Sequence, residues 1–224
     1  MEKLVLTTTP SPFALLTIHI SGKLALFRSD HPDWTIIPDM PTPYDDVCVF
    51  RGTLHAVDNT GRTVTVSVPD AALALAAAPV FGGDKKFLVE SDGALLLVDL
   101  YLSNREFEDF DDYDAAEIAI EWERTVRFEV FRLHEEEKRW VEVTSLGDTV
   151  LFLGDDCAFS ASANDLGVGR GNCIIFRDDG LEGVRVQNGM GVFNLDDGKI
   201  SPLSECPDFA QLFRPPDWAR LQLH

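Results

Sequence analysis

The chain has 224 residues, and its 38 Asp and Glu outnumber its 19 Lys and Arg, which gives a formal net charge of −19 at pH 7. With 45% hydrophobic residues the chain can bury a core, which excludes wholesale disorder. The negative charge argues against nucleic acids and anionic membrane surfaces as partners, because both require clustered Lys and Arg. No stretch reaches the roughly 20 apolar residues of a membrane span, and no basic region precedes an apolar N-terminal stretch. We therefore expect a cytoplasmic and/or nuclear protein.

Residue types that carry catalysis or bind metals are scattered. Four cysteines stand far apart without a C-x-x-C pair, so buried free thiols are expected rather than disulfides or a zinc site. The five histidines do not cluster with Cys or Asp at ligand spacing, and no G-x-S-x-G motif is present. Adjacent aspartates such as Asp45 and Asp46 are interpreted as turn residues rather than an acid/base pair. The sequence predicts no catalytic residue, cofactor or metal ligand, and a protein that is not an enzyme.

Short runs rich in Val, Ile, Thr and Phe follow one another from the N-terminus, separated by Pro, Gly and Asp or Asn clusters. Spacings of about 8–12 residues are typical of an all-β sandwich, barrel or propeller. The predicted strands, in chain order, are Leu4–Leu6, Leu15–Ile20, Lys23–Phe27, Thr35–Ile37, Val47–Phe50, Thr53–Val57, Arg62–Val68, Lys86–Val89, Ala94–Leu100, Arg127–Leu133, Trp140–Val143, Val150–Leu153, Cys173–Phe176 and Gly191–Leu195. The one clear helical expectation is a short Ala-rich helix over Asp70–Ala78, with Asp70 as its cap.

A degenerate internal repeat narrows the fold class. Gly22, Gly52 and Gly93 each begin a similar unit, in which glycine turns the chain and an apolar strand follows. Self-similarity at intervals of about 40–50 residues is typical of propellers, whereas a sandwich has no reason to repeat such a unit. The pattern predicts a kelch-like β-propeller, in which Trp34 and Trp140 are expected to act as packing anchors between blades.

A strongly acidic segment interrupts this pattern between Asn104 and Arg124. It contains nine acidic residues and two arginines, and paired strands would place like charges opposite one another. The segment is therefore predicted to be a solvated or disordered loop insertion. The alternative is a docking segment for a basic partner or a cation site, and the interleaved aromatic side chains favour docking. The candidate partner-binding residues are Phe107, Phe110, Asp111, Asp112 and Tyr113.

A series of motifs runs through the chain in a specific order and spacing. In the second half of the chain these motifs are Phe131–Leu133, Glu136–Val143, Ser145–Asp148, Leu151–Asp155, Phe159–Ala163, Gly171–Phe176, Gly191–Gly198 and Pro215–Trp218. In the first half they are Gly22–Phe27, Asp33–Trp34, Tyr44–Val47, Gly52–Asp58 and Phe87–Glu90. This series resembles one known family, the plant F-box-associated β-propeller proteins of KIB or SKIP type, also described as F-box/kelch-like. The resemblance covers nearly the whole chain.

The resemblance implies a fold and a function. Family members begin with a helical F-box that docks a Skp-type adaptor of a cullin ubiquitin ligase, and their propeller binds the substrate. The present sequence is expected to lack the F-box and the first part of the propeller. We expect one all-β domain over residues 1–224, a partial or reduced propeller of about four blades of antiparallel strands. Its expected structural anchors are Trp34, Gly52, Gly93, Trp140, Gly147, Asn172 and Trp218.

The function that follows is a non-enzymatic module that binds a protein partner, either a full-length F-box relative or its target. An open arc also leaves blade edges uncovered, so we expect the chain either to close with fewer blades or to bind something through its open face, by self-association or by pairing with a full-length relative. The alternative is an enzyme or binder that uses the central channel for a small molecule or a metal. Carboxylates with raised pKa in that channel would favour this alternative, and apolar plugging would oppose it. A third hypothesis is that the chain is a degenerate gene product with little function.

Overall fold

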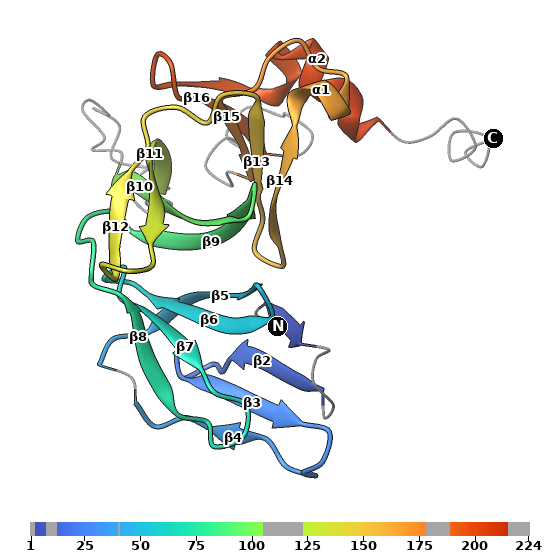
Figure 1. The fold of residues 1–224 in the computed structure, drawn as a ribbon. Coiled ribbons are helices and arrows are strands. Elements are labelled where there is room, and N and C mark those ends of the chain that lie inside the picture. Colours follow the sequence, from blue (N-terminus) through green and yellow to red (C-terminus); the bar gives the residue numbers. More distant parts are fainter. Residues whose placement is uncertain (1–2, 8–12, 40, 105–122, 178–188, 215–224) are drawn as a thin grey trace, which may run out of the picture.

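Four β-sheets follow one another along an arc in the computed structural model of the chain (Figure 1). The structure describes residues 3–7, 13–39, 41–104, 123–177 and 189–214. Most of the strands are antiparallel, and each sheet packs against the next through its faces. This confirms the predicted all-β fold, a partial β-propeller of four blade-like sheets.

The first three sheets are four-stranded antiparallel meanders, in which each strand pairs with its neighbour in the sequence. Sheet A contains β1 (Leu4–Thr7), β2 (Ala14–Ile18), β3 (Leu24–Arg28) and β4 (Thr35–Ile36). Sheet B contains β5 (Tyr44–Phe50), β6 (Thr53–Asp58), β7 (Thr63–Val66) and β8 (Leu73–Ala77). Sheet C contains β9 (Lys85–Ser91), β10 (Ala94–Asn104), β11 (Glu123–His134) and β12 (Arg139–Glu142).

Sheet D departs from this meander. It has five strands in the order β14-β13-β15-β16-β17, and β13 and β15 run parallel, which the prediction of antiparallel blades did not include. Its strands are β13 (Thr149–Leu153), β14 (Ala158–Ser162), β15 (Cys173–Arg177), β16 (Met190–Asn194) and β17 (Lys199–Pro202). Helix α1 (Ala163–Leu166) lies between β14 and β15, where a parallel pair needs a crossover. The chain continues through η2 (Leu203–Glu205), α2 (Pro207–Ala210) and η3 (Gln211–Phe213).

Apolar side chains fill the space between successive sheets. Leu16 of sheet A packs with Val47 and Leu54 of sheet B in one buried cluster. Equivalent clusters join sheet B to sheet C and sheet C to sheet D. Sheets B and C each pack against a neighbouring sheet on both faces. Because successive side chains of a strand point to opposite faces, their strands need apolar residues at consecutive positions, and their short continuous apolar runs provide them.

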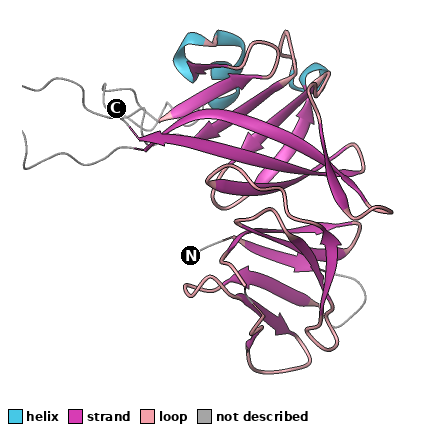
Figure 2. Ribbon diagram, turned by 90° about the vertical axis from the view of Figure 1, so that its left-hand side faces the viewer, coloured by secondary structure: helices cyan, strands magenta, loops and turns pink. Residues whose placement is uncertain are grey.

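The far face of sheet D is covered by the chain's own helical turns. Ile175 and Val192 of the sheet contact Phe209 of α2 and Val168, which follows α1, in a fourth buried cluster. Figure 2 shows these helices gathered at the end of the molecule farthest from sheet A. No described helix is long and apolar enough to cross a membrane.

The predicted helix over Asp70–Ala78 is wrong, because most of this segment forms strand β8. A turn precedes the strand: the Asp70 carboxylate accepts hydrogen bonds from the Ser67 hydroxyl and the Ala72 N–H, and Ala71 has φ = +56°. β8 then pairs with β7 and completes sheet B. The backbone partners offered by the sheet therefore outweigh the helix propensity of the alanines, which is small for each residue.

The two tryptophans expected as anchors differ in their surroundings. Trp140 is buried in the cluster between sheets B and C, and its Nε1 donates to the Gly61 carbonyl oxygen of sheet B at 3.1 Å. Trp34 is 46% exposed and packs at a tilt on Phe27 of its own sheet, so among the described residues it does not anchor sheet A to another sheet. Trp218 lies outside the described residues.

Gly52 and Gly93 each occupy the second position of a two-residue hairpin turn, with φ of +76° and +68°. Such turns need φ > 0 at both positions, which favours glycine. Gly147 also has positive φ, at +59°. The buried Asn172 ties sheet D together, since its side chain accepts from the Leu146 N–H at 2.7 Å and donates to Asp196 at 2.6 Å.

The four cysteines are free. Cys48 and Cys173 are buried as expected, and burial raises the pKa of both thiols. Cys206 is half-buried, and Cys157 is exposed in the turn after β13, contrary to the expectation of burial.

Candidate functional site

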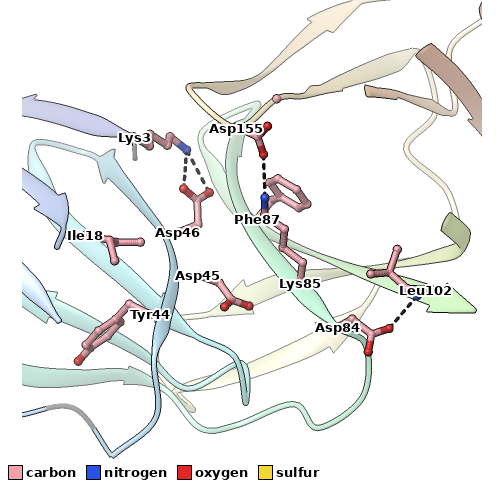
Figure 3. A pocket seen from close by; sticks show the side chains of 11 residues that line it. Lys3, Ile18, Tyr44, Asp45, Asp46, Asp84, Lys85, Phe87, Leu102 and Asp155 are labelled. Atoms are coloured by element: carbon pink, nitrogen blue, oxygen red, sulfur yellow. Dashed lines mark hydrogen bonds and ion pairs between the residues drawn. The ribbon is translucent and has the colours of Figure 1, made fainter. Parts of the chain in front are cut away.

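A cavity of about 520 Å³ lies where the four sheets meet, at the end of the arc's inner strands (Figure 3). Most of its polar lining is charged. The residues that line it are Lys3, Ile18, Tyr44, Asp45, Asp46, Asp84, Lys85, Phe87, Leu102, Gly154 and Asp155. Two ammonium groups therefore face four carboxylates, with an apolar and aromatic wall between them.

Asp46 joins three of the sheets at this cavity. Its two carboxylate oxygens lie 2.9 and 3.0 Å from Nζ of Lys3, which precedes β1. The same oxygens accept the N–H of Val47 at 2.7 Å and the N–H of Leu88 in β9 at 2.8 Å. Burial raises the pKa of the Asp46 carboxyl, and Lys3 opposes that rise. The carboxylate is thus a buried connection between sheets A, B and C.

A β-bulge brings Asp45 and Asp46 to the same junction. The register of β5 against β6 shifts between Tyr44 and Asp46, which leaves Asp45 as the extra residue. Asp45 then accepts the Lys86 N–H at 2.9 Å, two residues before the N–H that Asp46 accepts. The interpretation of these aspartates as turn residues is therefore wrong, because both lie within a strand and bind the backbone of the next sheet.

The proton affinity of Asp45 is raised at this cavity. Its burial raises the pKa of the carboxyl to about 6, although the Lys86 N–H and the charges of Lys86 and Lys85 act in the opposite direction. A carboxyl with this pKa changes charge close to neutral pH, which is common at binding and catalytic sites.

The opposite wall holds two further carboxylates. Lys85 Nζ and Asp155 Oδ1 lie 2.8 Å apart, an ion pair that connects sheet C to the turn after β13 of sheet D. Asp155 has a lowered pKa because of its hydrogen bond from Lys85. Asp84 accepts the N–H of Leu102 at 2.7 Å. These contacts position the carboxylates at the cavity rim, where Lys85 and Asp155 are both substantially exposed.

We expect Asp45→Asn to remove a pH dependence of stability between about pH 4 and 6. In this range the folded protein keeps a proton on Asp45 that the unfolded chain has lost, so the free energy of unfolding falls as pH rises. Asparagine keeps an oxygen for the Lys86 N–H but does not titrate. The free energy of unfolding of the variant, relative to that of the wild type, should rise by roughly 1–2 kcal/mol from pH 4 to pH 7. This energy is already reduced for solvent screening, because the cavity is open. Urea unfolding at several pH values measures this difference, and a flat difference would contradict the altered pKa.

The binding residues predicted from the sequence are not among those that the structure describes. Phe107, Phe110, Asp111, Asp112 and Tyr113 are outside the described residues, but the strands on either side of them are described. β10 and β11 remain paired as far as Asn104 and Glu123, beyond the last pair of β10 with β9 at Leu100 and Lys85. Asn104, Glu123 and Arg124 thus belong to strands, whereas the prediction placed these three residues in the insertion.

The site's chemistry is that of charge pairing and hydrogen bonding. Within the described ranges, no three His, Cys, Asp or Glu side chains are arranged to hold a metal ion. The cavity residues were missed by sequence reasoning, although charged residues at the start of otherwise apolar strands, as in Tyr44–Phe50 and Lys85–Ser91, were a usable signal.

The arc of face-packed sheets around this cavity defines a segment of a β-propeller, and comparison with known proteins assigns its family. A family model described as the KIB1-4 beta-propeller matches residues 1–194. The chain belongs to this family.

The most informative relatives are plant F-box proteins. The chain is 49% identical over 215 residues to F-box protein SKIP23 of Arabidopsis thaliana, covering 91% of this chain and 52% of the relative. It is 43% identical over 213 residues to F-box protein At2g17036, with the same coverage of 91% and 52%. A putative F-box/kelch-repeat protein of the same plant, At5g24040, is 28% identical over 203 residues, which cover 87% of this chain and 51% of that protein. The chain spans about half the length of the curated relatives it matches.

Proposed function

We propose that this chain is a non-enzymatic protein-binding module, equivalent to part of the propeller with which plant F-box proteins bind their substrates. In this proposal the acidic segment over residues 105–122 contacts a basic partner protein, which is either a ligase substrate or a full-length F-box relative. The propeller fold supplies the scaffold. The proposal extends to a cytoplasmic and/or nuclear location, where such partners occur.

The observation that carries the proposal is the projecting β10–β11 hairpin. Its strands have 11 and 12 residues, the longest of the described chain, and they hold both ends of the acidic segment at the paired residues Asn104 and Glu123. The segment between them has eight acidic residues, one arginine and several aromatic residues. The paired strands fix only the two points where the segment begins and ends, and a partner with clustered Lys and Arg would be attracted to its charge over a Debye length.

Replacement of residues 105–122 by a Gly/Ser linker of equal length tests the proposal. Partners recovered from a plant extract with the wild-type chain would be identified, purified and titrated against both proteins. We expect the linker variant to bind at least about tenfold more weakly, and the wild type to bind more weakly at high salt.

Two matched variants separate charge from aromatic contact. One changes Phe107, Phe110 and Tyr113 to Ser and keeps every charge, and the other changes the acidic residues to Asn and Gln and keeps the aromatics. Unchanged urea midpoints would establish that each variant folds. Binding of the same partner with equal affinity by the linker variant would contradict the proposal.

A second candidate function rests on the central cavity. Its volume of about 520 Å³ falls within the range of small-molecule pockets, and burial raises the pKa of both Asp45 and Asp46. Asp46 and Asp155 already pair with Lys3 and Lys85, so a small cationic ligand would bind through the remaining carboxylates, Asp45 and Asp84. Wild type and Asp45→Asn would be compared for stabilisation by a panel of polyamines, and stabilisation confined to the wild type would favour this function over partner binding.

A further inference from the structure

Phe81 is a large apolar side chain that the fold leaves in solvent. It is 78% exposed and lies in the connection between β8 and β9, which joins sheet B to sheet C. These are the two middle sheets of the arc, and each has a described sheet against both of its faces. A single exposed apolar residue is ordinary on a protein surface, so the surroundings of Phe81 decide what it means.

The backbone on both sides of Phe81 is held by hydrogen bonds. Before Phe81, the Ala78 N–H donates to the Lys138 carbonyl oxygen at 2.8 Å. After Phe81, the Asp84 N–H donates to the Leu100 carbonyl oxygen of β10 at 2.7 Å. Only five residues lie between these two anchored positions. The exposed ring of Phe81 therefore projects from a backbone that is fixed to sheet C at both ends.

Tyr101 of β10 lies directly beside this connection. An added Cβ at Gly82, the residue after Phe81, would collide with the Tyr101 hydroxyl oxygen. The Arg127 guanidinium carbon of β11 lies 3.9 Å from the centroid of the Tyr101 ring, and the Tyr101 hydroxyl donates to Glu129 at 2.8 Å. Glu129 also pairs with Arg127, with 3.2 Å between the charged atoms. We call Phe81, Tyr101, Arg127 and Glu129 together the hairpin-base surface.

The hairpin-base surface lies directly before the acidic segment. Tyr101 and Arg127 are cross-strand partners in β10 and β11, and Tyr101 comes three residues before Asn104, where β10 ends. In a strand this is a separation of about 10 Å. The exposed Asp84 adds a carboxylate beside β10, held by the Leu102 N–H at 2.7 Å (Figure 3). A partner attracted to the acidic segment would therefore meet aromatic side chains at its base.

We propose that the hairpin-base surface is an apolar anchor for a basic protein partner, and that it binds an aromatic side chain which the partner carries next to its lysines and arginines. This inference rests on the proposed function of the acidic segment. Charge complementarity favours such a partner over a second copy of this chain, which would bring the same formal charge of −19. Tyrosine and arginine are enriched among the residues that dominate interface energies. Charge thus selects basic partners, and the aromatic anchor discriminates among them.

Fluorescence anisotropy with two synthetic peptides tests the inference on the full chain. One peptide is lysine-rich with a central tryptophan, and the other has serine at that position, so the two peptides carry equal charge. We expect the wild type to bind the tryptophan peptide at least about fivefold more tightly, and Phe81→Ser to lose this preference. Leu75→Ser is the matched control and should keep the preference, because Leu75 is 44% exposed in the preceding strand β8.

The linker variant of residues 105–122 separates this inference from the proposed function. It should bind both peptides more weakly and keep the ratio of their affinities. A linker variant that binds both peptides as tightly as the wild type contradicts the proposed function. Equal binding of the two peptides by the wild type overturns the inference instead, as does a preference that persists in Phe81→Ser. Urea midpoints equal to that of the wild type establish that the serine variants are folded.

Discussion

Asp46→Asn is expected to lower the free energy of unfolding by about 3–5 kcal/mol, because it breaks a buried ion pair and its hydrogen bonds. Asp46 is 4% exposed, and each of its oxygens is shared between the Lys3 ammonium and a backbone N–H. An asparagine offers only one acceptor oxygen. Its NH₂ group must therefore face either the Val47 or the Leu88 N–H, while Lys3 loses its counter-ion.

The control for this prediction is the same substitution on the other side of the cavity. Asp155 also pairs with a lysine, at 2.8 Å from Lys85, but it is 70% exposed. Exposed pairs contribute little, so Asp155→Asn should cost less than about 1 kcal/mol. Urea unfolding of both variants gives the two midpoints. Equal small losses would show that Asp46 is not the connection between sheets A, B and C that its contacts indicate.

The strand pattern of the fold was predictable from the sequence, since burial on one or both faces fixes the hydrophobic period. Three strands were not predicted, and each lacks a run of β-branched residues. β8 is alanine-rich, β14 (AFSAS) has only alanine and serine besides one phenylalanine, and β17 (KISP) ends in proline. Such segments become strands because a neighbouring strand offers backbone partners, and this tertiary effect overrides local propensity.

The candidate site was less predictable, because its residues meet only in the fold. Lys3, Asp46 and Leu88 are separated by about 40 residues at each step and come from three sheets. The β-bulge that places Asp45 beside Asp46 also leaves no clear mark in the sequence. Trp140 and Trp34 illustrate the same limit: both are large aromatics in similar strand contexts, yet only Trp140 faces a neighbouring sheet.

A second buried ion pair lies within sheet C, between two cross-strand neighbours. Lys86 of β9 and Asp99 of β10 have fully buried side chains, and Lys86 Nζ donates to Asp99 Oδ1 at 2.7 Å and to the Gly83 carbonyl oxygen at 3.1 Å. Burial raises the pKa of the Asp99 carboxyl, and Lys86 opposes this rise. Gly83 lies so close that an added Cβ would be 2.1 Å from Asp99 Oδ1, so only glycine fits beside the pair.

Replacing one member of the Lys86–Asp99 pair should destabilise the protein much more than replacing both. Asp99→Leu leaves a buried ammonium without a counter-ion and should cost about 3–5 kcal/mol, whereas Lys86→Met with Asp99→Leu replaces both charges by apolar groups of similar shape and should recover most of that loss. The coupling free energy from the double-mutant cycle, measured by urea unfolding, should therefore be at least about 2 kcal/mol. Additive losses would mean that the two charges are solvated independently. A large coupling would instead show that the pair is needed only as a unit, because the buried position tolerates two apolar side chains but not one uncompensated charge.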